Sequence, residues 1–176
     1  MHITAIIPAR YHSTRLPAKL MRLLEGKTIL RRTYEAVSDT NLFSKVLVAC
    51  DHKDLQNEML RIGADVVVSQ QYHESGTDRI AEAAEKMETD IVVNIQGDEP
   101  FITKAALSSL LALFENPKVE IATLMMPITD KEKWQNPNCV KVVVDKNNKA
   151  LYFSRAAIPY LREGTEMPFV YQHIGV

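Results

Sequence analysis

Apolar residues in the first part of the chain form short continuous runs separated by segments of helical periodicity. The runs have strand length and lack the alternation expected of a sheet with one wet face; they lie at residues 3–7, 45–50, 65–68 and 91–95. Helical spacing follows each run, at residues 28–38, 53–62, 76–87 and 103–114. Ser75 and Thr103 stand where N-caps of the third and fourth helices are expected. This order predicts a parallel sheet that is flanked by helices.

The pattern changes after about residue 118, where strands are expected to follow one another directly. They are predicted at residues 119–126, 139–144 and 149–153, with a short helical turn at 131–134. Asp145-Lys146-Asn147-Asn148 predicts a hairpin turn between the last two strands. The final residues, 172–176, resemble the opening of another strand, so we expect the domain to continue. We predict one domain, with a βα part at 1–117 and an incomplete, strand-rich part at 118–176.

Composition narrows the class of protein. The 176 residues are 46% hydrophobic and 24% charged, which suits a globular domain with a sizeable core. A formal net charge of −1 lacks the basic excess of nucleic-acid binders, so an anion site must come from local clustering. Cys50 and Cys139 lie in apolar runs, as reduced core thiols do, and the first residues form neither a targeting nor a spanning segment. We expect a cytoplasmic protein that binds no nucleic acid and does not insert into a membrane.

A loop rich in cations and hydroxyls follows the first predicted strand, at residues 9–19. Its cations are Arg10, Arg15 and Lys19, and Ser13 stands among them. Ligands of open α/β sheets bind beyond the carboxyl ends of the strands, where this loop lies. Arg binds phosphate oxygens through forked hydrogen bonds and Lys binds them as a point charge, so the loop suits a triphosphate. Charge spacing alone leaves a solvated basic loop as an equal alternative. The absence of a P-loop or dinucleotide fingerprint argues against common NTPases and Rossmann dehydrogenases.

An acidic segment, Gln96-Gly97-Asp98-Glu99-Pro100, follows the fourth predicted strand at the same edge of the sheet. A carboxylate there can hold Mg²⁺, because this ion takes one or two protein carboxylates and fills its other positions with phosphate and water. Asp98 is the candidate ligand, ahead of Glu99. For an isolated Asp-Glu pair, an ordinary acidic turn before a helix is the commoner explanation.

A third candidate is the helix start Ser75-Gly76-Thr77-Asp78-Arg79. Gly76 would permit close backbone approach, Thr77 could meet a ribose or phosphate oxygen, and Arg79 could supply charge where helix N-termini favour anions. A plain capping box explains much of the same pattern. His173 is also a candidate, but one histidine in an apolar strand is more often a hydrogen-bonded core residue than a catalyst.

Taken together, these segments resemble the 3-deoxy-manno-octulosonate cytidylyltransferases. Seven motifs carry the resemblance, in the same order along the whole chain: Ile7-Pro8-Ala9-Arg10-Tyr11 with Ser13-Thr14-Arg15-Leu16-Pro17 and Lys19; Ala49-Cys50-Asp51-His52; Ser75-Gly76-Thr77-Asp78-Arg79; Val93-Asn94-Ile95-Gln96-Gly97-Asp98-Glu99-Pro100; Asn136-Pro137-Asn138 with Val140-Lys141-Val142-Val143; Leu151-Tyr152-Phe153-Ser154-Arg155 with Ile158-Pro159; and His173-Ile174-Gly175. The resemblance implies a Rossmann-like, mostly parallel α/β sheet flanked by helices, of the nucleotide-diphospho-sugar transferase type, with its C-terminal part missing.

The activity that the resemblance implies is transfer of CMP from CTP to 3-deoxy-manno-octulosonate (KDO), giving CMP-KDO and pyrophosphate for lipopolysaccharide synthesis. The anomeric hydroxyl of KDO would attack the α-phosphate of CTP in line. A Mg²⁺ cofactor and a homodimer are also implied, with the part after residue 118 as the expected contact surface.

The resemblance further implies roles for individual residues. The phosphates of CTP would be held by Arg10, Ser13, Arg15 and Lys19, and Mg²⁺ by Asp98. The nucleotide or sugar site would be lined by Gly76, Thr77, Arg79 and Gln96. On the sugar side of that site would lie Lys141, Arg155 and His173. The family usually reads Pro-Gly-Lys-Pro where this chain reads Pro17-Ala18-Lys19-Leu20. It also runs on for roughly another third of this length, where a second metal-binding aspartate is expected.

Three alternatives stay open. One keeps the fold and changes the sugar, to an 8-amino derivative of KDO or to a sialic acid. Another is a truncated, non-catalytic module that retains nucleotide affinity, and the last is a purely structural domain without nucleotide binding. Turnover with each candidate sugar separates the first from the main hypothesis, and nucleotide binding without turnover identifies the second.

Overall fold

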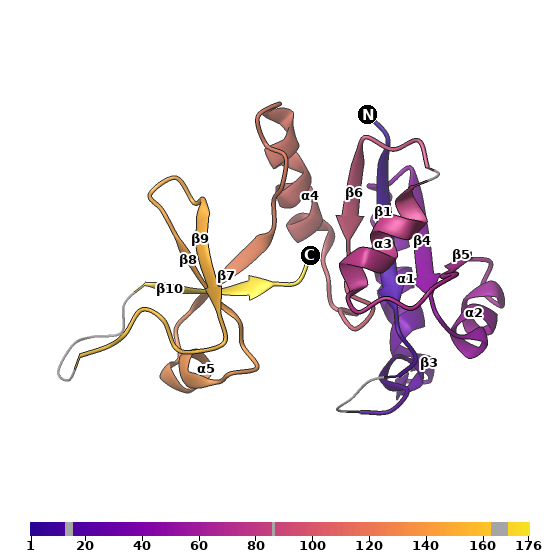
Figure 1. Cartoon of the computed structure of the whole chain (residues 1–176), viewed down its shortest axis with the longest axis horizontal. Coiled ribbons are helices and arrows are strands. Elements are labelled where there is room, and N and C mark those ends of the chain that lie inside the picture. The colour runs from indigo at the N-terminus through magenta and orange to yellow at the C-terminus, as the bar shows by residue number, and fades with distance from the viewer. Residues whose placement is uncertain (13–15, 86, 163–168) are drawn as a thin grey trace. The chain divides into compact units, whose positions relative to one another are not determined.

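The chain folds as two compact units, Met1–Glu115 and Asn116–Gly175 (Figure 1). The computed structural model describes residues 1–12, 16–85, 87–162 and 169–176. The change of pattern that the sequence places after residue 118 falls close to the boundary between the units. Each unit has its own sheet, and the two are described separately.

The first unit is built on a four-stranded parallel sheet in the order β5-β4-β1-β6. The strands are β1 (Ile3–Ala9), β4 (Lys45–Cys50), β5 (Asp65–Val68) and β6 (Ile91–Asn94). The helices are α1 (Ile29–Ser38), α2 (Lys53–Leu60), α3 (Gly76–Ala84) and α4 (Lys104–Ala112), the last followed by a short 3-10 helix, η2 (Leu113–Glu115). Figure 1 shows α3 in front of the sheet and α1 on its other face. The predicted parallel sheet with flanking helices is confirmed.

Continuous burial along β1 explains why its residues are apolar apart from Thr4, which is itself buried. Ile6 and Ile7 are successive residues that point to opposite faces of the sheet, and neither has any exposed surface. On one face Ile6 and Leu47 pack with Ile80 and Ala83 of α3. Since helices cover both faces, a polar residue at either position would lose its hydration, which is why the strand does not alternate.

A hairpin that the sequence pattern did not predict lies between β1 and α1. It follows a 3-10 turn, η1 (Lys19–Met21), and pairs β2 (Leu23–Leu24) with β3 (Lys27–Thr28). Its two-residue turn is formed by Glu25 and Gly26, both at positive φ, as tight hairpins require. Strands of two residues are too short to give a periodic signal, so the sequence could not reveal them.

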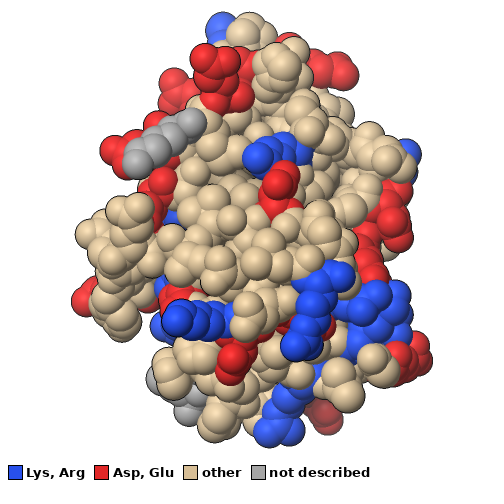
Figure 2. Space-filling view, turned by 90° about the vertical axis from the view of Figure 1, so that its right-hand side faces the viewer, with Lys and Arg blue, Asp and Glu red and all other residues tan. Residues whose placement is uncertain are grey.

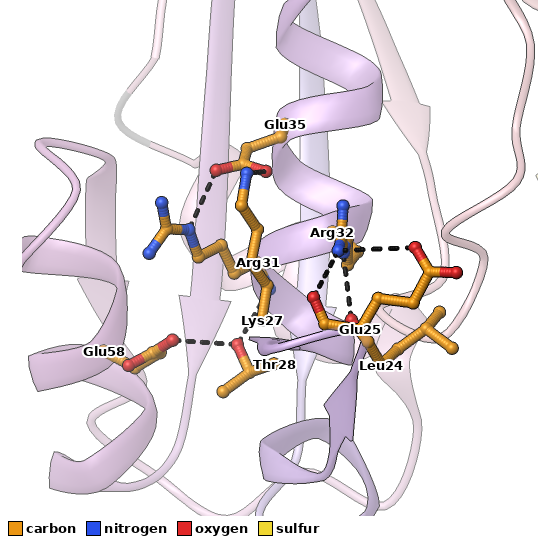
Figure 3. Close-up of polar contacts among 8 residues, drawn as sticks. All are labelled: Leu24, Glu25, Lys27, Thr28, Arg31, Arg32, Glu35 and Glu58. Carbon is orange, nitrogen blue, oxygen red and sulfur yellow. Dashed lines mark hydrogen bonds and ion pairs between the residues drawn. The ribbon is translucent and has the colours of Figure 1, made fainter.

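Side chains from the flanking helices fix this hairpin (Figure 3). Arg32 donates from Nε to the Leu24 carbonyl at 3.1 Å and from Nη2 to the Glu25 carbonyl at 2.7 Å. Thr28 caps α1 and donates its hydroxyl to Glu58 Oε1 of α2 at 2.9 Å. The hairpin is therefore held by two helices, and it continues directly from the segment that carries Lys19.

The second unit contains a four-stranded antiparallel sheet in the order β7-β10-β8-β9. Its strands are β7 (Leu124–Ile128), β8 (Lys141–Val144), β9 (Ala150–Ser154) and β10 (Val170–Ile174), and its helix is α5 (Lys131–Gln135). The predicted turn at 145–148 does join two antiparallel strands. The strand predicted at 119–126 instead runs over Leu124–Ile128, because its ends are set by pairing with β10.

A small apolar cluster forms the core of the second unit. Ile128, Trp134, Cys139 and Val170 are each at most 6% exposed and pack together. The indole N–H of Trp134 is satisfied by the Ile158 carbonyl at 2.9 Å. The short helix α5 is thus anchored by its one large aromatic residue.

The cysteines and the surface charge agree with what the composition indicates. Cys50 and Cys139 are both buried free thiols. Within the described ranges, no helix combines the length and the apolar character that a bilayer span needs. Figure 2, which looks onto the side that carries α2 and β5, shows basic side chains gathered mostly in the lower half of that face. Positive charge is therefore clustered locally in a chain whose net charge is −1.

Candidate functional site

A cavity of about 340 Å³ lies in the first unit, at the carboxyl edge of the parallel sheet. Its lining comes from the ends of β1 and β6 and from the start of α3: residues 8–10, 19–20, 73–76 and 96–98, with Arg79. The strand order reverses beside β1, because β4 pairs with one side of this strand and β6 with the other. Open α/β sheets bind ligands at such a reversal. The cavity therefore occupies the position where a ligand is expected.

Cations and a carboxylate face each other in this cavity. Arg10 and Lys19 line it together with Asp98, and the ammonium of Lys19 donates a hydrogen bond to Asp98 Oδ2. The side chains of Lys19 and Asp98 are 41% and 39% exposed, so water screens their attraction and a charged ligand can replace it. The structure thus brings together Arg10, Lys19 and Asp98 from two separate loops. Ser13 and Arg15 lie outside the described residues.

Asp98 is positioned by close packing around the preceding glycine. The hydroxyl of Thr33, which is fully buried in α1, donates to the Gly97 carbonyl at 2.9 Å. A Cβ atom at Gly97 would lie 3.1 Å from both the Pro8 carbonyl oxygen and Leu20 Cδ1. A side chain at this position would therefore push the two loops of the cavity apart. The contribution of Thr33 could not be inferred from the sequence, where it is one polar residue in an amphipathic helix.

Glu99 differs from Asp98 in its surroundings. Burial raises the pKa of Glu99, the neighbouring charge of Asp98 raises it further, and Lys19 partly offsets both. Glu99 consequently takes up a proton more readily than an exposed glutamate. Among the described residues, no group of three or more His, Cys, Asp or Glu side chains is arranged to hold a metal. One or two carboxylates still suit Mg²⁺ when phosphate and water complete its coordination, so the residues present fit that ion.

The start of α3 is capped as the sequence predicts. Ser75 Oγ accepts a hydrogen bond from the Asp78 N–H at 3.1 Å and donates to the Asp78 carboxylate at 2.7 Å. Gly76 lines the cavity, and a Cβ atom there would lie 3.3 Å from the Pro8 ring. Thr77 is exposed on the first turn and is not part of the cavity lining. The close backbone approach expected at Gly76 is therefore an approach to Pro8 of the same chain.

Arg79 lines the cavity, but its guanidinium is already engaged. The side chain is 3% exposed and donates from Nη2 to Asp51 Oδ2 at 3.0 Å and from Nη1 to Ser69 Oγ at 3.1 Å. The expected direct contact of Arg79 with substrate would have to compete with these hydrogen bonds. Asp51 was not predicted as a site residue, although an acid placed directly after a buried strand is a visible signal.

Two further residues complete the wall of the cavity. His73 is 8% exposed and its Nε2 lies 2.5 Å from Glu82 Oε2. Hydrogen bonds from His73 and from the Gln70 N–H lower the pKa of Glu82. Gln96 lines the cavity and donates its amide to Asn94 Oδ1 at 3.1 Å. Gln96 is one of the site residues that the sequence predicts, whereas His73 is not.

Lys141 lies in the interior of the second unit. Its side chain has no exposed surface, and Nζ donates to three backbone carbonyls: Asn136 at 2.9 Å, Cys139 at 2.6 Å and Arg155 at 2.7 Å. An ammonium group has three hydrogens, so all of them are used. The expected contact of Lys141 with a sugar is at odds with this position. The side chain instead cross-links the loops that carry these three carbonyls.

Arg155 and His173 are more accessible than Lys141. Arg155 is exposed and donates from Nη1 to the Pro137 carbonyl at 3.1 Å. The His173 ring lies 2.9 Å from the Thr123 hydroxyl through Nε2 and contacts the Phe153 ring edge-on, with centroids 5.0 Å apart. Burial lowers the pKa of His173, so the neutral ring is favoured. Both residues keep surface that a ligand could reach.

Comparison with known proteins identifies relatives of this chain. A family model described as cytidylyltransferase matches residues 4–176. A 3-deoxy-manno-octulosonate cytidylyltransferase of Flavobacterium johnsoniae is 50% identical over 179 residues, which cover 100% of this chain and 73% of the relative. The protein of the same name from Christiangramia forsetii is 48% identical, over 99% of this chain and 71% of the relative.

Among solved structures, the chain is similar to CMP:2-keto-3-deoxy-manno-octonic acid synthetase complexed with CTP. The TM-score is 0.91 at 36% sequence identity, and the match covers 99% of this chain and 72% of that one. The similarity extends over both units, including the segments that line the cavity.

Proposed function

The chain belongs to the cytidylyltransferase family, and we propose that it transfers CMP from CTP to KDO, giving CMP-KDO and pyrophosphate. The family resemblance that the motifs indicate is confirmed by relatives of that name at 50% and 48% identity. The product would serve lipopolysaccharide synthesis in the cytoplasm. In the reaction the anomeric oxygen of KDO bonds to the α-phosphorus of CTP, the bond to the β-phosphate oxygen breaks, and the hydroxyl proton is released.

The observation that supports this proposal most is the meeting of Arg10, Lys19 and Asp98 in one cavity. A magnesium triphosphate carries anionic oxygens that need cations and a metal that needs a carboxylate. Arg10 and Lys19 would hold phosphate oxygens and stabilise the charge that develops on the departing pyrophosphate. Phosphoryl and nucleotidyl transfer demand little covalent chemistry from the protein, so placing these charges is its main task.

Asp98 is the proposed ligand of Mg²⁺, with Glu99 beside it. The bound ion would neutralise phosphate charge and polarise the reacting phosphate group. Lys19 pairs with Asp98 in the structure. A magnesium triphosphate would give each of these side chains a new partner, phosphate for Lys19 and metal for Asp98. The ion pair therefore keeps the Lys19 ammonium and the Asp98 carboxylate near the positions where they would bind phosphate and metal. Neither charge is buried.

Other residues complete the proposal on the strength of the family resemblance. Ser13 and Arg15 would bind the phosphates with Arg10, and Gln96, Gly76 and Thr77 would approach the nucleotide or sugar. The sugar acid itself would be bound by Arg155 and His173.

A homodimer is also proposed, through the second unit. Among the described residues of that unit, the large apolar side chains that are between 41% and 91% exposed are Ile121, Met126, Leu151, Tyr152, Phe153, Tyr160 and Phe169. Exposed apolar residues gathered on one small unit are typical of a surface that another chain covers. Light scattering coupled to size exclusion measures the mass in solution, and a mass of one chain would overturn this part of the proposal.

Turnover tests the activity. Pyrophosphate release from CTP, Mg²⁺ and KDO is measured with this chain and with the chain extended by the C-terminal segment of the Flavobacterium johnsoniae relative. We expect CMP-KDO from the extended protein, and a loss of at least about a hundredfold in Asp98→Asn, since one metal ligand is removed. Asp65→Asn serves as the control, because Asp65 pairs with Lys45 at the opposite edge of the sheet.

The identity of the sugar is decided by the same assay. KDO, 8-amino-KDO and a sialic acid are compared side by side at equal concentrations. Preference for either of the other acids would replace KDO in the proposal, and absence of any CMP-sugar from the extended protein would refute it.

A further inference from the structure

Asp51 joins three separate elements at the edge of the cavity. It follows β4 directly, and its Oδ1 accepts the backbone N–H of Tyr11 at 2.9 Å. Its Oδ2 accepts from Arg79 of α3 at 3.0 Å. One carboxylate thus connects the end of β4, the loop after β1 and the first turn of α3.

Arg79 keeps this carboxylate in place. The arginine side chain is 3% exposed, and a buried guanidinium requires a charged partner. Its second donor is directed at Ser69 Oγ, at 3.1 Å. Since two of its nitrogens are held by different residues, the guanidinium cannot rotate without losing a hydrogen bond, and Asp51 is fixed with it.

Tyr11 is docked on Asp51 and His52, the two residues that follow β4. Beyond the hydrogen bond to Asp51, its ring stacks on His52 with centroids 3.9 Å apart and planes 19° apart. His52 is itself held, because its Nδ1 accepts the Asp54 N–H at 3.1 Å and caps α2. Backbone and ring of Tyr11 are therefore both constrained.

Arg10 stands between these anchor points. On one side Ala9 is paired with Cys50 in the parallel sheet, and on the other side Tyr11 is held by Asp51. The Arg10 side chain is exposed and lines the cavity. A cation whose backbone is fixed on both sides loses less conformational freedom when it binds an anion.

We propose that Asp51, held by Arg79, is a positioning residue that sets the backbone of Arg10 for binding the triphosphate of the nucleotide. This inference rests on the proposed function, and it gives Arg79 a supporting task in place of direct contact with substrate. Asp51 itself does not touch the ligand and acts through Arg10.

A double-mutant cycle tests the inference, with inorganic triphosphate as the probe. Calorimetry measures its affinity for the unaltered chain, Asp51→Asn, Arg10→Gln and the double variant. Each single substitution is expected to weaken binding by about tenfold, because a charge-assisted hydrogen bond is lost or misdirected. The double variant should bind no more weakly than Arg10→Gln alone, since Asp51 has no effect without Arg10.

Additive losses would overturn the inference, because Asp51 would then act independently of Arg10. Failure of the unaltered chain to bind triphosphate would instead overturn the proposed function, and the inference with it. Asp65→Asn is the control, since this carboxylate pairs with Lys45 at 3.4 Å on the opposite edge and should leave affinity unchanged.

A second variant guards against misfolding of Asp51→Asn, which circular dichroism and thermal unfolding would detect. Arg79→Lys keeps the charge and loses the forked geometry that binds Asp51 and Ser69. It should weaken triphosphate binding less than Asp51→Asn, and again only while Arg10 is present. If Arg79→Lys lowered triphosphate affinity by the same factor in the Arg10→Gln variant as in the unaltered chain, the proposal would be contradicted.

Discussion

Ala18 shows how one residue can carry strain next to the site. Its φ of 49° and ψ of 37° are left-handed, and its carbonyl accepts the Met21 N–H at 2.9 Å in the turn that presents Lys19. A Cβ atom in this region costs roughly 1–2 kcal/mol relative to ordinary helical backbone. The motif of the related family usually has glycine at this position. The left-handed backbone of Ala18 is the physical reason.

Replacing Ala18 with glycine should stabilise the first unit. We expect Ala18→Gly to raise the free energy of unfolding by about 0.5–1 kcal/mol, the relief of strain being partly offset by the greater freedom of unfolded glycine. Urea unfolding measures the change. Ala81→Gly on the exposed side of α3 is the matched control, and there the same replacement should destabilise by about 1 kcal/mol. A loss of stability in Ala18→Gly would contradict the interpretation.

His173 should make the stability of the second unit depend on pH. Burial lowers the pKa of its ring below the usual 6.5, so the unfolded chain binds a proton at a higher pH than the folded one. The free energy of unfolding should therefore fall as the pH drops through 6.5 toward the folded pKa, and be constant above that window. His173→Gln should lack this loss. Unfolding curves at several pH values compare the two proteins, and parallel pH profiles would be evidence against the assignment.

At the level of elements, the N-caps of α3 and α4 distinguish the effect of a residue on protein stability from its effect on ligand binding. Both α3 and α4 begin with a hydroxyl that accepts a backbone N–H, from Ser75 and Thr103. Only Ser75 also lines the cavity. The two caps are therefore chemically similar, and only one of them lies beside the proposed ligand.

Substitution of each cap by alanine should separate these effects. Ser75→Ala and Thr103→Ala are each expected to destabilise the protein by about 1 kcal/mol, because one helix N–H loses its acceptor. Ser75→Ala should in addition weaken CTP binding, and Thr103→Ala should not. Denaturant unfolding and calorimetry measure the two properties. Equal effects of both substitutions on CTP affinity would show that the cap acts only through stability.

At the scale of the whole molecule, the lining of the cavity comes from the first of the two units. Every residue of the cavity lining belongs to Met1–Glu115. That unit also has its own core around the parallel sheet, including Ile6 and Leu47. A compact unit with a complete core can fold alone.

The fragment Met1–Glu115 should therefore fold and bind triphosphate. We expect its affinity for inorganic triphosphate to lie within about threefold of that of the whole chain, since no lining residue is removed. CMP-KDO formation should be absent. Circular dichroism checks the fold and calorimetry the affinity. A folded fragment that does not bind triphosphate would mean that the second unit contributes to the site.

The parallel sheet of the first unit was predictable because its strands are continuous apolar runs, as burial on both faces requires in β1 and β4. Its parallel strands begin at the expected residues: Ile3, Lys45, Asp65 and Ile91. In the second unit, by contrast, the strand expected at 119–126 begins at Leu124. Its limits depend on pairing with Ile174 fifty residues later, and local periodicity contains no information about such a partner.

For the candidate site, the sequence by itself determined which loops carry charge and at which edge of the sheet they lie. Arg10, Lys19 and Asp98 meet because parallel strands end at a common edge. Only the tertiary structure decided which polar groups bind each other: Arg79 is joined to Asp51, and Lys141 to three backbone carbonyls. The reason is physical, since a side chain's hydrogen bonds depend on distances of about 3 Å that are set only when separate elements pack together.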